Sequence, residues 1–357
     1  MAANMLEVKQ LKKYFPVRQS IFEALRRAPV QNVKAVDEVS FSLAKGEVLA
    51  LVGESGCGKT TIARTLMGLE EATDGSILFN GQPVTAHERR RRTGVLSVET
   101  NTTPTRTVPE PAGIQSIMLK RLRQRAQMVF QDPYESLNPR ATILEIVSEP
   151  LEVHGLLRQP QERLNRVKTA LEEAGLRPAE DYYHRFPYEL SGGQRQRVVI
   201  AGALVLQPEL LIADEPVSML DVSIRADILN LLRGLRDSRG ISILFITHDF
   251  GTVAYFAERI AVMYLGRIVE LGATRDVLRH PQHPYTKALL SVVPAPNPRE
   301  RRERVILQGE TPNPINIPCG CRFHPRCPVA IDRCKEIDPP FVEVTAQHQA
   351  ACLLVEK

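Results

Sequence analysis

Short apolar runs, each bounded by glycine, proline or charged residues, recur along the chain and predict a layered fold. Residues 47–53, 209–216 and 241–249 are nearly continuous apolar runs, which is typical of strands buried on both faces. A helical pattern follows the first run over 60–69, and a second helical pattern, over 223–236, separates the other two. Because strands that alternate with helices build parallel sheets, we expect an α/β fold with a parallel core.

Alternating apolar and polar positions predict further strands outside this core. They occur at 5–15 and 33–44, a short strand is expected at 76–81, and residues 259–272 read as a closing pair of strands.

Three other stretches differ in character. Residues 132–205 are mostly helical in pattern, with breaks expected at prolines and a glycine, namely Pro150, Gly155, Pro178 and Pro187. Residues 84–118 are rich in Thr, Pro and Arg and predict an exposed insertion. The chain becomes proline-rich after residue 280, which indicates a boundary followed by a small appended module.

Composition narrows the class of protein. The 357 residues are 43% hydrophobic and 24% charged, as in an ordinary globular protein, and this excludes a disordered tail or a small disulfide scaffold. No run approaches about 18 apolar residues, and the N-terminus lacks the apolar core of a signal peptide. We therefore expect a protein that stays in the cytosol and does not cross a membrane by itself.

The net charge of +5 is concentrated in one segment. Residues 86–125 hold nine Lys or Arg against three Glu, so the rest of the chain is slightly acidic. A basic charge confined to one segment, together with the absence of Trp, does not indicate a basic surface for nucleic acid, and no nucleic-acid partner is expected. The basic segment is either a solvated loop or a contact for anionic lipid headgroups or a partner.

A glycine-rich loop lies between the first buried run and its helix. The sequence GESGCGKT at 53–60 fits the pattern G-x-x-x-x-G-K-[ST], in which backbone amides and a helix N-terminus surround phosphate. Lys59 would reach the β- and γ-phosphates, and the Thr60 hydroxyl would bind Mg²⁺. The residues predicted to bind nucleotide here are Gly53, Glu54, Ser55, Gly56, Cys57, Gly58, Lys59, Thr60 and Thr61.

Two adjacent carboxylates end the second buried run. In LLIADE at 210–215, Asp214 is placed to hold Mg²⁺, and Glu215 is the candidate base that polarises an attacking water. Acidic residues at the end of a buried strand are poorly explained by structure alone, and so the pair favours an NTPase.

Several ordered motifs then identify a family. GESGCGKT (53–60), VFQDP (129–133), LSGGQ (190–194), LIADEP (211–216), SMLD (218–221) and THD (247–249) together resemble the nucleotide-binding subunit of ABC transporters. The resemblance implies an ATPase with a RecA-like parallel sheet, an antiparallel β subdomain and an α-helical signature subdomain at 132–205. It also implies that hydrolysis needs a dimer, since one chain supplies the phosphate loop and another the signature.

The resemblance assigns further roles. Phe15, or Tyr14, matches the aromatic residue that stacks on adenine; Gln131 matches the loop glutamine that senses Mg²⁺, and His248 the switch histidine. The residues matching the signature and the loop across the dimer interface are Ser191, Gly192, Gly193, Gln194 and Asp221. Glu215, His248 and Gln131 are thus the expected catalytic group, with Mg²⁺ held by Thr60, Gln131 and Asp214.

Three longer segments narrow the resemblance to the oligopeptide/dipeptide importer branch, namely FQDPYESLNPR (130–140), HPYTKALL (283–290) and GCRFHPRCP (320–328). It implies an ATPase domain at 1–272 and an extension at 273–357, on the cytoplasmic face of the membrane. The implied partners are a second, similar ATPase chain, two permease subunits and, through these, an extracytoplasmic solute-binding protein. The alternatives are a soluble ABC ATPase not coupled to transport and a scaffold for iron–sulfur assembly.

Five of the six cysteines follow residue 318. Cys321, Cys327, Cys334 and Cys352 provide four thiols, enough for one [4Fe–4S] cluster or one Zn²⁺, and their spacing does not choose between the metals. Resemblance to the importer branch favours the iron–sulfur cluster, with Cys319 spare. His324 and His348 are further candidate ligands, and unpaired reduced thiols are the alternative.

Overall fold

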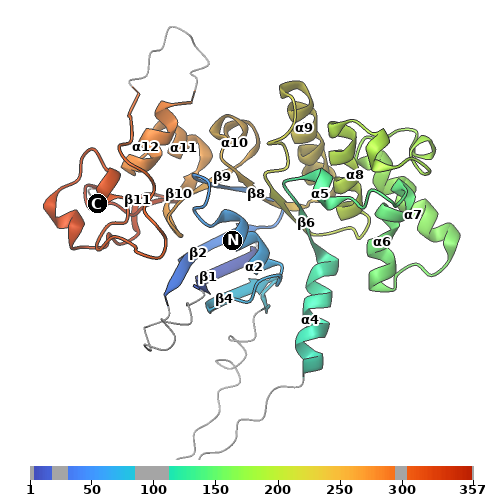
Figure 1. Cartoon of the computed structure of the whole chain (residues 1–357), viewed down its shortest axis with the longest axis horizontal. Helices are drawn as coiled ribbons and strands as arrows, with labels where there is room; N and C mark the ends of the chain where they lie inside the picture. The colour runs from blue at the N-terminus through green and yellow to red at the C-terminus, as the bar shows by residue number, and fades with distance from the viewer. Residues whose placement is uncertain (1–3, 18–30, 85–111, 294–303, 356–357) are drawn as a thin grey trace, which may run out of the picture.

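The computed structural model describes residues 4–17, 31–84, 112–293 and 304–355, with backbone only for 112–117. An eight-stranded sheet forms its centre, in the order β11-β12-β10-β9-β3-β8-β7-β6 (Figure 1). The strands are β3 (Val48–Val52), β6 (Ala126–Val129), β7 (Leu210–Asp214), β8 (Ser242–Thr247), β9 (Arg259–Tyr264), β10 (Arg267–Ala273), β11 (Val342–Thr345) and β12 (His348–Ala350).

Five neighbouring strands of this sheet, from β9 to β6, run parallel. All residues of β3, β7 and β8 are buried, because helices cover one face and a second sheet and helix α2 (Lys59–Leu66) cover the other. The predicted α/β fold with a parallel core is therefore confirmed, and the closing pair at 259–272 is β9 and β10, which are antiparallel.

A four-stranded antiparallel sheet in the order β2-β1-β4-β5 lies below the central sheet in Figure 1. Its strands are β1 (Asn4–Pro16), β2 (Asn32–Ala44), β4 (Asp74–Phe79) and β5 (Gln82–Pro83). The alternation read from the sequence places Leu6, Val8 and Leu43 in the core between the two sheets. The same sheet brings Ala35 against the phosphate loop.

The predicted helical region at 132–205 is a set of short helices, drawn from teal to yellow-green toward the right of Figure 1. They are α5 (Pro133–Ser136), α6 (Ile143–His154), α7 (Pro160–Glu173), η1 (Ala179–Asp181), η2 (Pro187–Glu189) and α8 (Gly192–Leu204). Gly155 ends α6 with a left-handed φ of 68°. Pro150, in contrast, lies inside α6 and not at a break, because Val147 and Leu151 hold the adjoining turns against the core.

The last part of the predicted exposed insertion at 84–118 is helical in the structure. Residues 85–111 lie outside the described residues, but 112–118 begin helix α4 (Ala112–Arg125), where the sequence predicts an exposed loop. The Thr- and Pro-rich composition ends at Pro111, and Leu119 and Leu122 then take helical spacing. Leu122 is buried against the core that α2 and the antiparallel sheet share, which stabilises the helix.

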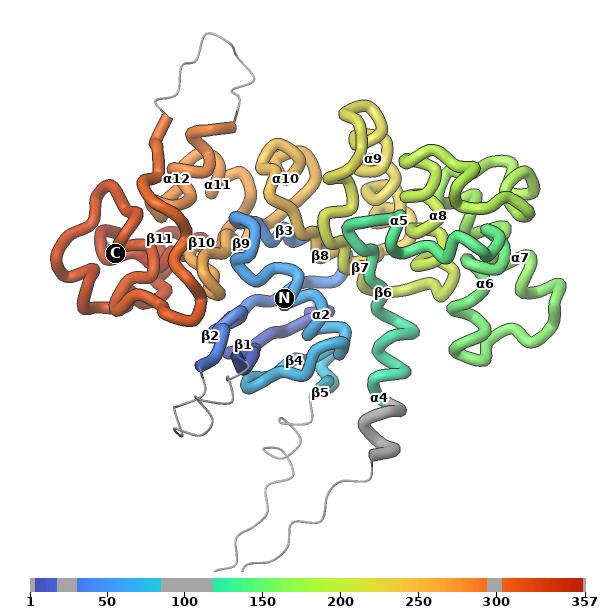
Figure 2. The backbone as a smooth tube through the Cα atoms, viewed as in Figure 1, coloured from blue at the N-terminus to red at the C-terminus, as the bar shows by residue number. Residues whose placement is uncertain are grey.

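The described parts of the C-terminal segment, residues 274–293 and 304–355, are joined to the central sheet (Figure 2). After α9 (Val222–Arg239) and α10 (Phe250–Phe256), it contains α11 (Thr274–Arg279), α12 (Pro284–Ser291), η3 (His324–Arg326) and η4 (Asp332–Lys335). Its strand β12 pairs with β10, so the segment extends the sheet instead of forming a detached module.

A buried carboxylate fixes this junction. Glu270 of β10 accepts hydrogen bonds from the backbone N–H groups of Gln282 and His283 and contacts Nε2 of His348 at 2.8 Å. His283 in turn accepts the N–H of Tyr285 and begins α12. Both histidines are buried and paired, so the HPYT sequence has a clear structural role at this corner.

Candidate nucleotide site

The phosphate loop has the geometry that its glycines predict. It follows β3 and ends at α2, and Gly56 and Gly58 take left-handed φ values of 79° and 108°. A Cβ on Gly53 would lie 2.2 Å from the carbonyl oxygen of Met263, and one on Gly58 would lie 2.1 Å from that of Ala35. The loop is therefore packed so closely against β2 and β9 that side chains are excluded at these two positions.

The lysine of the loop is buried at the start of α2. Lys59 is 5% exposed, and its Nζ donates to the carbonyl oxygens of Gly53 at 2.8 Å and Glu54 at 2.9 Å. Its ammonium group thus lies inside the curve of the loop, together with the N-terminus of α2, and both favour an anion there. Cys57 is buried, and this burial raises the pKa of its thiol, so it acts as a small apolar residue.

Asp214, at the end of β7, has the environment of a cation ligand. Burial, with the adjacent charge of Glu215, raises the pKa of Asp214, although a hydrogen bond with Thr60 opposes that rise. Its Oδ1 is buried without a hydrogen-bond partner. An uncompensated buried carboxylate oxygen beside a hydroxyl is a donor set that suits Mg²⁺.

Three predicted catalytic residues meet across different elements. The Gln131 amide, which follows β6, donates to Oε2 of Glu215 at 3.1 Å, and Nδ1 of His248, after β8, lies 3.2 Å from Oε1. Glu215 itself has a left-handed φ of 47°, held by its N–H bond to Ile246. Seven other described non-glycine residues also have a left-handed φ, so it is the contacts with Gln131 and His248, and not the backbone conformation, that mark Glu215 as a candidate functional residue.

One pocket, with a cavity volume of about 550 Å³, brings the phosphate loop together with Gln131, Glu215 and His248. It is lined by Ala35, Ser55, Gly56, Gly58, Lys59, Thr60, Thr61, Gln131, Glu215 and His248. Ala35 of β2 is the one lining residue that the sequence did not indicate, and only its place in the antiparallel sheet brings it here. Four predicted residues of the phosphate loop and Mg²⁺ site do not line the pocket, namely Gly53, Glu54, Cys57 and Asp214. The side chain of Glu54 contacts the C-terminal segment instead.

The structure separates the two aromatic candidates for adenine stacking. The hydroxyl of Tyr14 donates to Asp37. Burial, and to a smaller extent this hydrogen bond, raises the pKa of Tyr14. Phe15 is half-buried on β1 beside the Lys13 ammonium, which lies 4.6 Å from its ring. Tyr14 is thus committed to a structural bond, and Phe15 is the better candidate. Neither lines the pocket.

The signature residues do not line this pocket. Ser191 caps α8, its hydroxyl accepting the Gln194 N–H while the Gln194 side chain accepts the Ser191 N–H. A Cβ on Gly193 would lie 2.6 Å from Ile224 of α9, so the glycine allows α8 to begin against α9. Ser191, Gly192, Gly193, Gln194 and Asp221 are not among the residues that line the pocket.

The predicted metal site at the cysteines is wrong. Among the described residues, which include Cys321, Cys327, Cys334 and Cys352, no group of three or more His, Cys, Asp or Glu is placed to hold a metal ion. Cys321 and Cys327 pack against the apolar core instead. Neither a [4Fe–4S] cluster nor Zn²⁺ fits these residues.

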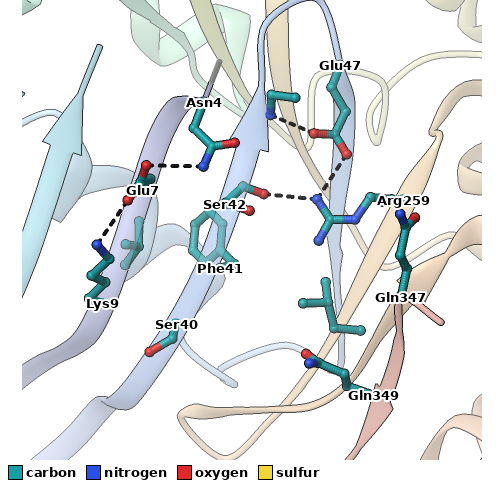
Figure 3. A pocket seen from close by; sticks show the side chains of 13 residues that line it. Asn4, Glu7, Lys9, Ser40, Phe41, Ser42, Glu47, Arg259, Gln347 and Gln349 are labelled. Atoms are coloured by element: carbon teal, nitrogen blue, oxygen red, sulfur yellow. Dashed lines mark hydrogen bonds and ion pairs between the residues drawn. The ribbon is translucent and has the colours of Figure 1, made fainter. Parts of the chain in front are cut away.

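A different cleft, of about 660 Å³, lies between β1 and β2 on one side and the end of the central sheet on the other (Figure 3). Its charged groups are already paired. Arg259 donates to Glu47 and to the carbonyl of Ser42, each at 3.1 Å, and Glu7 pairs with Lys9. None of the predicted nucleotide residues lines it, so cleft size does not identify the functional site here.

The fold and the site define a nucleotide-binding cassette, and comparison with known protein families agrees. The model of the ABC transporter family matches residues 36–117 and 110–218. The chain belongs to this family and is an ABC-type ATPase. A second model, "Oligopeptide/dipeptide transporter, C-terminal region", matches residues 269–334, and the chain belongs to the oligopeptide/dipeptide branch.

Similar curated proteins span essentially the whole chain. The oligopeptide transport ATP-binding protein AppF of Bacillus subtilis is 46% identical over 99% of each chain. The dipeptide transport ATP-binding protein DppF of Haemophilus influenzae is 43% identical over 99% of this chain and 97% of its own.

Solved structures give the same fold. The ATP-binding cassette MJ0796, in a dimeric post-hydrolysis state bound to ADP and Pi, is 26% identical with a TM-score of 0.58, covering 76% of this chain and 99% of its own. Clostridium perfringens cbiO1, part of the ABC transporter complex cbiONQ, also has a TM-score of 0.58 at 26% identity, covering 78% of this chain and 92% of its own. Within the described ranges, no helix has both the length and the apolar character needed to span a bilayer.

Proposed function

We propose that this chain binds and hydrolyses ATP to power import of di- or oligopeptides, or of chemically related solutes, through a membrane complex. The observation that carries the proposal is the pocket that unites the phosphate loop with Gln131, Glu215 and His248. The names of the curated relatives, which match over nearly the whole chain, support the peptide class of solute.

In this proposal the loop residues Gly53 to Thr61 bind the phosphates, with Lys59 neutralising their charge and Phe15 stacking on adenine. Thr60, Asp214 and Gln131 hold Mg²⁺, which supplies charge neutralisation to the reacting phosphates. The unpaired Oδ1 of Asp214 supports that role. Glu215 accepts the proton of the attacking water, while Gln131 and His248 hold its carboxylate in place.

We further propose that the working unit is a dimer of two similar ATPase chains. Ser191, Gly192, Gly193 and Gln194 begin α8, where backbone N–H groups favour phosphate, yet they do not line this chain's own pocket. A partner chain would bring its pocket to these residues, with Asp221 at the interface. The C-terminal segment is proposed to be an extension of the ATPase domain.

The proposed partners are two membrane-spanning permease subunits, which receive a solute-binding protein on the outer side. The ATPase is then a peripheral protein of the cytoplasmic face. Exposed side chains beside the Gln131 loop, among them Phe130 at 39% and Tyr134 at 61%, provide a surface for such contacts.

Gentle purification of the tagged chain from native membranes tests this assembly. Two multi-spanning subunits and a second ATPase are expected to co-purify, identified by mass spectrometry. A strain lacking the chain should lose uptake of labelled di- or tripeptides, and the wild-type gene should restore it while a Glu215→Gln gene should not. Recovery of the chain with no membrane partner, and unchanged peptide uptake, would contradict the proposal and favour a soluble ABC ATPase.

A further inference from the structure

The phosphate loop is contacted from outside by the C-terminal segment. The carboxylate of Glu54, the second residue of the loop, accepts two hydrogen bonds from the Arg326 guanidinium, at 2.8 Å to Oε2 and 3.1 Å to Oε1. The hydroxyl of Thr311 donates to the same carboxylate at 2.8 Å and lies 3.2 Å from Arg326. Arg326 is 272 positions away in sequence, so this contact exists only in the folded chain.

The same loop residue is also held by its backbone. The N–H of Glu54 donates to the hydroxyl of Tyr285 at 3.0 Å, and its carbonyl oxygen accepts from Nζ of Lys59 at 2.9 Å. Tyr285 is fully buried and packs against Tyr264 and Phe323, with ring centroids 4.7 and 5.4 Å away. The tyrosine hydroxyl therefore has a fixed position, and it fixes the loop at the point where its carbonyl meets the phosphate-binding lysine.

The ion pair has the character of a rigid contact. The side chains of Arg326 and Glu54 are 9% and 27% exposed, and the bidentate geometry matches a planar guanidinium to a carboxylate. Burial alone would raise the pKa of Glu54, but Arg326, Thr311 and the charge of Lys59 lower it overall. Glu54 is therefore ionised at neutral pH, and the pair persists there.

Docking of the C-terminal segment does not depend on this contact. Arg322 donates to Asp37 and to the carbonyl of Leu265, Arg267 pairs with Asp338, and β12 pairs with β10. These bonds hold the segment on β2 and the central sheet at other points. Arg326 is therefore not needed to hold the segment in place, and a substitution of Arg326 should leave the segment docked.

We infer that Tyr285, Thr311 and Arg326 form a loop brace that positions the phosphate loop, so that the C-terminal segment sets the affinity of the ATPase for MgATP. Arg326 and Tyr285 are positioning residues, since both act through Glu54 and Lys59. The inference rests on the proposed nucleotide site and adds that residues outside the ATPase motifs tune it. A loop without the brace must be ordered by the nucleotide, and that ordering cost weakens binding.

The test measures binding of Mg²⁺ with a non-hydrolysable ATP analogue to the full chain. Arg326→Gln is expected to raise the dissociation constant about 10-fold, as for the loss of a charge-assisted hydrogen bond. Arg326→Lys should recover part of the affinity because it restores the charge without the fork. Glu54→Gln should weaken binding to a similar extent, and the Glu54→Gln/Arg326→Gln double variant should bind little worse than either single variant.

Two controls separate positioning from docking. Lys335→Gln removes a surface ion pair with Asp332 that does not contact the loop, and it should change neither affinity nor Tm. Arg267→Gln removes anchors to Glu38 and Asp338, and it should lower Tm more than it lowers affinity.

Unchanged affinity in Arg326→Gln would overturn the brace, as would additive effects of the Glu54 and Arg326 substitutions. The proposed site fails separately if the wild-type chain does not bind the analogue or if Lys59→Ala binds it equally well.

Discussion

Glu215→Gln is expected to reduce ATP turnover at least about 100-fold while MgATP binding stays close to that of the wild type. The amide cannot accept a proton from water, yet it retains the size of the carboxylate and can still contact Gln131 and His248. In the structure both neighbours lie within hydrogen-bonding distance of the Glu215 carboxylate, Nε2 of Gln131 at 3.1 Å and Nδ1 of His248 at 3.2 Å. Phosphate release by the assembled transport complex at saturating MgATP measures the turnover, and analogue binding measures the affinity.

The matched control for this change is Glu180→Gln. Glu180 is an exposed carboxylate whose partner is Lys168, and it lies outside the pocket, so this variant should retain wild-type turnover. If Glu215→Gln hydrolyses ATP normally, Glu215 is not the base. If the variant loses MgATP binding instead, its carboxylate serves the bound nucleotide or Mg²⁺, and the role assigned to Asp214 would need to be shared.

The parts of this fold that could be predicted from sequence are those fixed by local pattern. The runs that became β3, β7 and β8 are apolar throughout because both faces of the central sheet are covered. The phosphate loop was equally clear, since few other structures need Gly56 and Gly58 at these positions followed by lysine. Convergence of Gln131, Glu215 and His248 also follows from topology, as each comes after a parallel strand at the same sheet edge.

Long-range contacts could not be predicted in this way. Nothing near Arg326 in the sequence indicates that it pairs with Glu54, and Tyr285 belongs to a motif whose neighbours explain only a helix start. The choice between Tyr14 and Phe15 depended on Asp37, which reaches Tyr14 across the antiparallel sheet.

The prediction of a metal site at the cysteines was wrong for a related reason. Four cysteines near one end of the chain are enough to bind one metal ion or cluster. Their spacing in sequence, however, gives neither the distances between their sulfur atoms nor the extent of their burial. In the structure Cys321 and Cys327 pack against apolar side chains, and among the described residues no three potential ligands are placed to hold a metal ion. A prediction from spacing alone therefore mistook residues of a small packed core for a metal site.

Gly58→Ala is expected to have the largest effect on the nucleotide site of any single methyl addition in the loop. Gly58 has a φ of 108°, and the new Cβ would lie 2.1 Å from the carbonyl oxygen of Ala35 and 2.9 Å from Cε of Met263. The backbone oxygen cannot move without shifting β2, so the loop itself must move. We expect a loss of MgATP affinity of about 100-fold and a destabilisation of about 3 kcal/mol.

Gly56→Ala provides the comparison that isolates the cause. Gly56 also has a left-handed φ, 79°, but apart from its two neighbours in the chain no described residue would have an atom within 4 Å of a Cβ added there. Its substitution should cost only about 1 kcal/mol of backbone strain and leave affinity within about 5-fold of the wild type. Circular dichroism can follow unfolding of both variants, since the chain has no Trp for fluorescence. Equal effects of the two substitutions would mean that backbone strain, and not the contact with Ala35, limits this loop; a larger effect at Gly58 would identify close packing against β2 as what holds the phosphate loop in its binding conformation.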